Sequence, residues 1–293
     1  MKQKNTSLIA CGLLALALAA PGGARAQTAY ATPEVAADAL ISAVAANDEK
    51  ALTRVLGAKW RELLPPQDLR SNDRQLFLDK AREARAVSVD KDRGELLIGN
   101  DKWPLPIPLA RTPQGQWKFD ISGGRQALLE RRIGTNEQSA IQAALAYVDA
   151  QRDYALADRN GDGIPEYARR LLSNPGKRDG LIWDPKLGDD SPLGEGFIPS
   201  KPGTGYHGYR FKILEAQGPH AAGGARSYLL GDRLLTGYAL VAWPVLWGQS
   251  GVMSFIVNHD GVVYERDLGP QTSKLAGAIK QFDPDEHWKR VTP

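Results

Sequence analysis

The sequence is poor in cysteine, with Cys11 as the single one in 293 residues. Cys11 lies in an N-terminal segment that we expect to be removed, so the mature chain would contain no thiol. A chain without thiols has no disulfide framework, no thiolate metal site and no cysteine nucleophile. It also suits an oxidising compartment, because it cannot form wrong disulfides there.

An excess of charge of one sign is lacking as well. The full chain has 37 Lys and Arg against 34 Asp and Glu. Residues 1–26 contain three of the basic residues and no acid, so the remainder carries 34 charges of each sign. Without a basic field or a basic stripe interleaved with aromatic residues, nucleic-acid binding is disfavoured.

The sequence contains a single long apolar run, close to its start. Two lysines precede an apolar stretch over residues 8–20, which is shorter than the roughly 20 residues of a membrane-spanning helix. Ala24 and Ala26 then supply the small residues that signal peptidase recognises. Residues 8–11 resemble a lipoprotein cleavage box, but most of the apolar run follows Cys11, which disfavours lipidation. We therefore predict a signal peptide over residues 1–26, a periplasmic location and no transmembrane segment in the mature chain.

After this segment, helix signals come first and strand signals second. Thr32 before Pro33 is typical of a helix start, and further helices are expected after Asp48 and from Asp73 to Ala84. Strands are expected over residues 86–88, 95–98, 103–109 and 116–121. This order predicts an N-terminal α+β domain over residues 27–124.

The second half opens with the longest helical pattern, from Gln126 to Ala157. Gly134 interrupts the pattern, and Thr135 with Gln138 resembles a capping box for its second part. A short helix over residues 166–172 and a long loop over residues 174–205 are expected next. Strands are then expected over 209–216, 227–230, 237–243, 251–257 and 262–267, with an Asp-Gly hairpin turn at residues 259–261 and a last helix over 273–282. We predict a C-terminal domain over residues 125–293, and the α+β class for the whole chain.

One motif carries recognisable chemistry. In the segment from Asp158 to Glu166, oxygen side chains occupy loop positions 1, 3, 5 and 9, and Gly163 at position 6 permits a sharp turn. This spacing predicts a calcium site with the ligands Asp158, Asn160, Asp162, the Ile164 carbonyl and Glu166. An EF-hand would need a bidentate glutamate at position 12, where this chain has Arg169. The alternative is a turn rich in Asp and Asn that binds no ion.

Histidines and aromatic residues give weaker signals. His207 and His259 could meet as an acid–base couple, and a hydrolase could use either of them with Asp179 or Asp260. Such residues are more often hydrogen-bonded turn histidines. No serine lies in a nucleophile elbow. A ligand groove could include His207, Tyr209, Trp243, His259 and Asp260. The alternative is that the aromatic residues belong to a sheet core.

Several longer runs carry a family resemblance. They are residues 146–154, 158–166, 175–181, 206–209, 217–219, 239–244 and 257–264. With these runs, the chain over roughly residues 31–291 resembles the uncharacterised exported bacterial family 2950 of domains of unknown function. The resemblance implies a proteobacterial envelope protein and no activity that can be named. The second half is also loosely similar to type II secretion pseudopilins, in which a helix, a calcium-supported loop and an antiparallel sheet follow one another. Since a whole domain precedes the helix here, this is an analogy of fold only.

From these observations we predict a non-catalytic binding or envelope-maintenance module with a calcium-stabilised loop. Its partner would be an unknown envelope protein or a small ligand. The alternative function is an envelope hydrolase that uses histidine and aspartate side chains near the long loop.

Overall fold

The computed structural model describes residues 27–64, 72–159, 161–194, 197 and 203–292. The predicted signal peptide, including Cys11, lies outside these residues. The chain forms two compact units that divide between Gln126 and Ala127. We call them the N-terminal unit and the C-terminal unit. Their contents confirm the α+β class, while the division into two domains at residues 124 and 125 stays a prediction.

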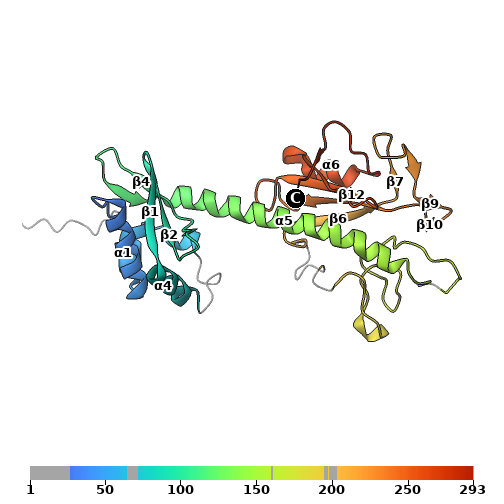
Figure 1. Ribbon diagram of the computed structural model, residues 1–293, viewed down its shortest axis with the longest axis horizontal. Coiled ribbons are helices and arrows are strands. Elements are labelled where there is room, and N and C mark those ends of the chain that lie inside the picture. Colours follow the sequence, from blue (N-terminus) through green and yellow to red (C-terminus); the bar gives the residue numbers. More distant parts are fainter. Residues whose placement is uncertain (1–26, 65–71, 160, 195–196, 198–202, 293) are drawn as a thin grey trace, which may run out of the picture. The chain divides into compact units, whose positions relative to one another are not determined.

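In its described residues, the N-terminal unit combines helices with an antiparallel sheet (Figure 1). The helices are α1 (Pro33–Ala45), α2 (Glu49–Leu56), α3 (Trp60–Leu63) and α4 (Asp73–Glu83). Local signals explain two of them: the Thr32 side chain caps α1, and Asp48 accepts hydrogen bonds from the first turn of α2. The predicted helix starts are therefore confirmed.

The sheet of this unit has the order β1-β2-β4-β5, and β3 pairs with β2. The strands are β1 (Arg85–Asp90), β2 (Arg93–Ile98), β3 (Trp103–Pro104), β4 (Leu109–Arg111) and β5 (Trp117–Phe119). The single strand predicted over 103–109 is wrong, since Pro104, Pro106 and Pro108 interrupt it. Proline has no backbone N–H to donate to a neighbouring strand, so the segment divides into two short strands.

Helix α5 (Ile121–Tyr154) is continuous, so the predicted break at Gly134 and cap at Thr135 are wrong. A glycine inside a helix costs about 1 kcal/mol relative to alanine. The packing of the following turns outweighs that cost: Ala140, Ala144 and Tyr147 are buried in the core of the C-terminal unit.

The main sheet of the C-terminal unit has the antiparallel order β14-β13-β12-β11-β6. Its strands are β6 (Tyr209–Leu214), β11 (Ala239–Pro244), β12 (Met253–Asn258), β13 (Tyr264–Asp267) and β14 (Lys289–Arg290). Two small ladders pair β7 (Ala216–Gln217) with β8 (Arg226–Ser227) and β9 (Leu229–Leu230) with β10 (Arg233–Leu234). The predicted turn at residues 259–261 is confirmed, with Gly261 at a φ of 75°.

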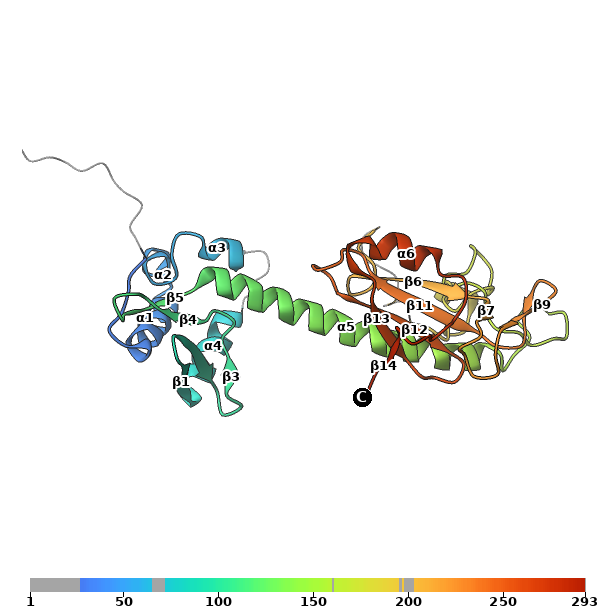
Figure 2. The same cartoon turned by 90° about the horizontal axis from the view of Figure 1, so that it is seen from above.

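Helices α5 and α6 (Thr272–Ala278) cover opposite faces of this sheet (Figure 2). On one face the Tyr147 hydroxyl donates to the Ala239 carbonyl, and the Tyr238 hydroxyl donates to the Val148 carbonyl. On the other face the Lys212 ammonium donates to the Gly277 carbonyl at the end of α6. Strand β11 is buried along its whole length, as expected for a central strand with both faces covered.

The short helix predicted over residues 166–172 is wrong, because this segment is extended. Its backbone groups bond to distant partners rather than to each other. The Tyr167 N–H donates to the Leu234 carbonyl, and the Ile182 N–H donates to the Leu171 carbonyl. The segment thereby lies between β10 and the start of the long loop, which itself contains the short 3₁₀ helix η2 (Pro185–Leu187).

Candidate functional site

The segment from Asp158 to Glu166, which we call the acidic loop, follows α5 and makes a turn at each of two glycines. The carboxylate of Asp158 accepts the Gly161 N–H at 2.8 Å and the Gly163 N–H at 2.7 Å. Gly161 and Gly163 have φ values of 79° and 85°, a region that favours glycine. The glycine predicted at loop position 6 therefore makes the sharp turn. Asn160 lies outside the described residues.

Asp162, the central predicted ligand, forms a bidentate ion pair. The Arg233 guanidinium, on β10, donates to both carboxylate oxygens; the Nη1–Oδ1 distance is 2.9 Å. Burial raises the pKa of the neighbouring Glu166 carboxyl above its ordinary value, an effect that the charge of Arg233 opposes. Among the described residues, no group of three or more His, Cys, Asp or Glu side chains is arranged to hold a metal ion.

The acidic loop and the long loop together line a cavity of about 1010 Å³ in the C-terminal unit. The acidic loop contributes Asp162 and Glu166, and the long loop contributes residues 176–179 and Leu187. The extended segment 167–170, Asp232 and Arg233 also line it, and Tyr154, Arg159 and Glu215 complete the lining. The two segments that the sequence singled out as unusual therefore share one concave site.

Gln151 fixes the position of the extended segment. This glutamine is fully buried on α5, and its side-chain amide bonds to both backbone groups of Ala168, with distances of 2.7 and 2.8 Å. It also donates to the Tyr147 hydroxyl at 3.0 Å. One side chain thus replaces the strand partner that this piece of backbone would otherwise need.

Arginines on the cavity wall are held by carboxylates and by aromatic rings. Arg169 contacts Glu215 at 2.7 Å and donates to the Asp232 carbonyl. Arg178 and Arg159 both reach Asp189, at 2.6 and 3.6 Å. These two guanidinium groups also lie 5.9 and 5.4 Å from the ring centre of Trp183, within the range of a cation–π interaction. The wall therefore presents charged groups that are already oriented.

The structure does not bring the predicted groove residues together. His207 precedes Tyr209, which pairs with Pro244 at one end of β11. His259 follows Asn258, which pairs with Ala239 at the other end. The two histidines therefore lie at opposite ends of the sheet.

The two aromatic members of the predicted groove point to opposite faces of that sheet. Tyr209 lies directly across from Pro244, so it shares a face with Pro244 and not with Trp243. Tyr209 is fully buried and Trp243 is 8% exposed. Both are core residues, which was the alternative reading of the aromatic concentration.

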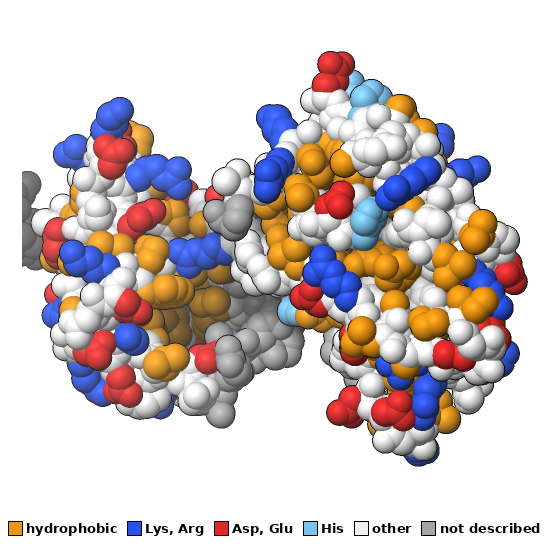
Figure 3. Space-filling model, turned by 45° about the vertical axis from the view of Figure 1, so that its right-hand side comes forward, with side chains coloured by type: hydrophobic (Ala, Val, Ile, Leu, Met, Phe, Trp, Pro, Cys, Tyr) orange, Lys and Arg blue, Asp and Glu red, His pale blue; other side chains and the backbone are white. Residues whose placement is uncertain are grey.

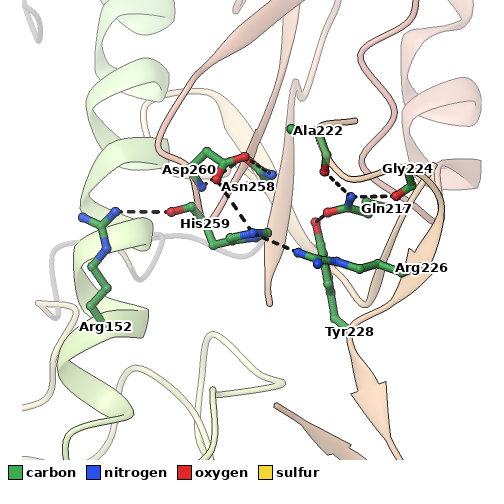
Figure 4. A network of polar contacts seen from close by, with 9 residues as sticks. All are labelled: Arg152, Gln217, Ala222, Gly224, Arg226, Tyr228, Asn258, His259 and Asp260. Atoms are coloured by element: carbon green, nitrogen blue, oxygen red, sulfur yellow. Dashed lines mark hydrogen bonds and ion pairs between the residues drawn. The ribbon is translucent and has the colours of Figure 1, made fainter. Parts of the chain in front are cut away.

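His259 belongs to a separate polar network (Figure 4). Its Nε2 lies 3.3 Å from a guanidinium nitrogen of Arg226 and 3.8 Å from a carboxylate oxygen of Asp260. Since a guanidinium only donates, the Arg226 contact requires Nε2 to be the acceptor. Tyr228 and Tyr238 pack edge-on against the ring. The imidazole thus connects the turn after β12 to Arg226 on β8.

Three features of the C-terminal unit escaped the sequence analysis: the role of Gln151, the pairing of Arg233 with Asp162, and a surface pair of His220 and Asp283. The His220 Nδ1 lies 3.0 Å from the Asp283 carboxylate. Partners of this kind are distant in the chain; Asp162 and Arg233 are 71 residues apart. No local pattern signals them.

The surface of the C-terminal unit carries charges of both signs, interspersed with apolar side chains over the face seen in Figure 3. Within the described part of the chain, no helix combines the length and the apolar character that crossing a membrane requires. The mixture of charges on this surface agrees with the balanced charge of the sequence.

Comparison with known proteins supports the family resemblance and adds no activity. No curated protein and no solved structure matches the chain. A family model described as a protein of unknown function, DUF2950, matches residues 27–291, which is nearly the whole chain. The chain belongs to this family of unknown function, DUF2950.

Proposed function

We propose that the protein is an exported, periplasmic binding module without catalytic activity, and that the cavity of the C-terminal unit is its ligand site. The observation that carries the proposal is the cavity itself, because the acidic loop and the long loop both line it. Its volume of about 1010 Å³ lies at the upper end of the range of small-molecule sites. If the ligand is a component of the cell envelope, the module would serve envelope maintenance.

The placement of the histidines supports binding over hydrolysis. A hydrolase of the predicted kind would need His207 or His259 beside Asp179 or Asp260. Asp179 lines the cavity, whereas no His, Ser or Cys is among the described residues that line it. His259 and Asp260 lie together, but with Arg226 and the two tyrosines around the imidazole.

We further propose that calcium stabilises the acidic loop. The support is the spacing of oxygen side chains from Asp158 to Glu166 and the presence of Asp162 and Glu166 on the cavity wall. Because Arg233 now engages both oxygens of Asp162, calcium would have to displace this guanidinium. Calcium binding would thus replace the Arg233 guanidinium by a calcium ion at the Asp162 carboxylate.

The proposed binding function is tested by calorimetric titration of the chain from Gln27 onward, in EDTA. Four probes of different charge are used: citrate, spermidine, maltotriose and trialanine. At least one is expected to bind, to be recovered unchanged by mass spectrometry, and to bind more weakly to a K177W variant that adds bulk at the cavity wall. The matched control is K274W, since Lys274 is also exposed but does not line the cavity. Absence of binding by all four probes, or equal loss in both variants, would contradict the proposal.

A further inference from the structure

The charged side chains in and beside the cavity form two groups with opposite net charge. Ion pairs and position along the chain define the members of each group. One group surrounds Glu166: it contains the carboxylates Asp162, Glu166, Glu215 and Asp232 with the guanidinium groups of Arg169 and Arg233. Four negative charges face two positive ones in this group, which we call the acidic group.

The second group surrounds the start of the long loop. It contains Arg159, Arg170, Lys177, Arg178 and Asp179, which line the cavity, together with Asp189, which is not part of the lining but pairs with two of these arginines. Four positive charges face two negative ones, and we call this the basic group. Asp189 is shared by two arginines, while no ion pair of Arg170 or Lys177 is found in the described part of the chain.

The cations of the basic group are partly withdrawn from water, which makes their excess charge costly without an anion. The side chain of Arg159 is 17% exposed and that of Arg178 is 33% exposed. Both lie over Trp183, and both reach the same half-exposed Asp189 carboxylate. Two partly desolvated guanidinium groups with one carboxylate favour the approach of a second anion.

Tyr154 marks where the two groups meet. Burial raises the pKa of this phenol to about 12, the charges of Glu166 and Asp179 add to that rise, and the charge of Arg159 opposes it. The Tyr154 hydroxyl donates to the Arg178 carbonyl at 2.8 Å. Tyr154 lines the cavity, and the charge of Glu166 from one group and that of Arg159 from the other both act on its phenol. The two groups therefore adjoin in one cavity.

We propose that the ligand is a zwitterion with separated charges, and specifically a short peptide with a free amino terminus and a free carboxyl terminus. Its ammonium group would lie against the acidic group and its carboxylate against the basic group. This inference rests on the proposed binding function and adds the chemical class of the ligand. A simple anion would satisfy one group and meet repulsion at the other, and a simple cation would do the reverse. The cavity volume favours a peptide of a few residues over a single amino acid.

The test is calorimetric titration with trialanine and its three end-blocked forms: N-acetyl-trialanine, trialanine amide and N-acetyl-trialanine amide. Blocking either end is expected to weaken binding about tenfold, since each removes one charge-assisted contact. In an R170Q/K177Q double variant the advantage of the free carboxylate should disappear, and in D232N the advantage of the free amine should disappear. The three side chains are exposed, so the variants are expected to fold.

The controls are K274Q and E286Q, which change exposed charges away from the cavity and should leave both preferences unchanged. Equal binding of free and doubly blocked trialanine would overturn the zwitterion inference and leave the binding function standing. Preferences that persist in R170Q/K177Q and D232N would place the peptide elsewhere and also overturn it. Failure of trialanine together with citrate, spermidine and maltotriose would contradict the binding function itself.

Discussion

Two regions of the C-terminal unit, the five-stranded sheet and the segment that lines the cavity, are held by different interactions. In the sheet, strand β11 is buried along its whole length and packs between two helices. The cavity segment instead depends on single polar side chains: Gln151 bonds to Ala168, Arg233 to Asp162 and Arg169 to Glu215. The sheet is stabilised by many small contributions that together are large, whereas the cavity wall relies on a few bonds. Changes in the first should affect global stability, and changes in the second should affect local order and binding.

The largest effect is expected in the sheet. Phe255 on β12 is 1% exposed and packs against Tyr209. F255A should lower the free energy of unfolding of the C-terminal unit by about 3–5 kcal/mol, because it removes buried apolar surface and leaves a cavity. Urea unfolding followed by tryptophan fluorescence measures this loss. L246A, at an exposed position, is the control, and a similar loss in both variants would contradict the packing described here.

A smaller but more local effect is expected at Gln151. Q151A would leave the N–H and the carbonyl of Ala168 buried without partners, at a cost of about 2–4 kcal/mol. Hydrogen exchange should become faster over residues 166–173, while the strands of the sheet keep their protection. Q142A, an exposed position on the same helix, provides the matched control. Uniformly faster exchange throughout the unit would show that the segment and the sheet do not differ as proposed.

The calcium proposal predicts opposite effects of two variants on the same loop. Replacing Asp158 and Asp162 by alanine should abolish any rise in melting temperature caused by calcium. R233Q removes the cation that engages Asp162, so calcium should stabilise this variant at lower concentrations than the unchanged chain. Thermal unfolding in EDTA and in rising calcium measures both. If the alanine variant retains the calcium effect, the loop is a turn that binds no ion.

The smallest effect on stability is expected from replacing Asp179. Burial by itself would raise the pKa of this carboxyl, but hydrogen bonds from the Asn174 N–H and side-chain amide more than offset burial and hold the pKa below its ordinary value. A lowered pKa in the folded state stabilises the fold above the ordinary pKa of about 3.9, and that stabilisation is lost as the pH falls further.

D179A should therefore differ from the unchanged chain at pH 7 by less than about 1 kcal/mol, because solvent screens the site. The difference should shrink below pH 4. Melting temperatures across this pH range measure it, and a difference independent of pH would indicate a loss of packing instead.

The same contrast explains what the sequence could predict. Some features depend on contacts within a few residues, so the sequence pattern predicts them. They are the helix starts at Thr32 and Asp48 and the turn at Asp260 and Gly261. The unbroken α5 rests on the burial of its later turns, and the extended segment after the acidic loop rests on the hydrogen bonds of Gln151 with Ala168. Local propensity favoured a break at Gly134 and a helix over residues 166–172, but tertiary packing and hydrogen bonds prevailed.

The site shows the same limit. The sequence singled out the acidic loop and the long loop separately, and both line the cavity. It did not predict the arginines of that cavity, because their partners lie elsewhere in the chain: Arg169 pairs with Glu215, Arg178 with Asp189 and Arg233 with Asp162. The residues of the groove predicted from histidines and aromatics lie apart for a related reason: strand register, which places Tyr209 and Trp243 on opposite faces, is not visible in a list of residue types.

Hydrogen–deuterium exchange of the chain from Gln27 onward, with and without trialanine, shows whether the peptide binds in the cavity. We expect slower exchange over residues 166–170, 176–179 and 232–233, which line the cavity, and no change in the N-terminal unit. Unchanged exchange in these segments under saturating trialanine, or protection confined to other parts of the chain, would contradict binding in the cavity.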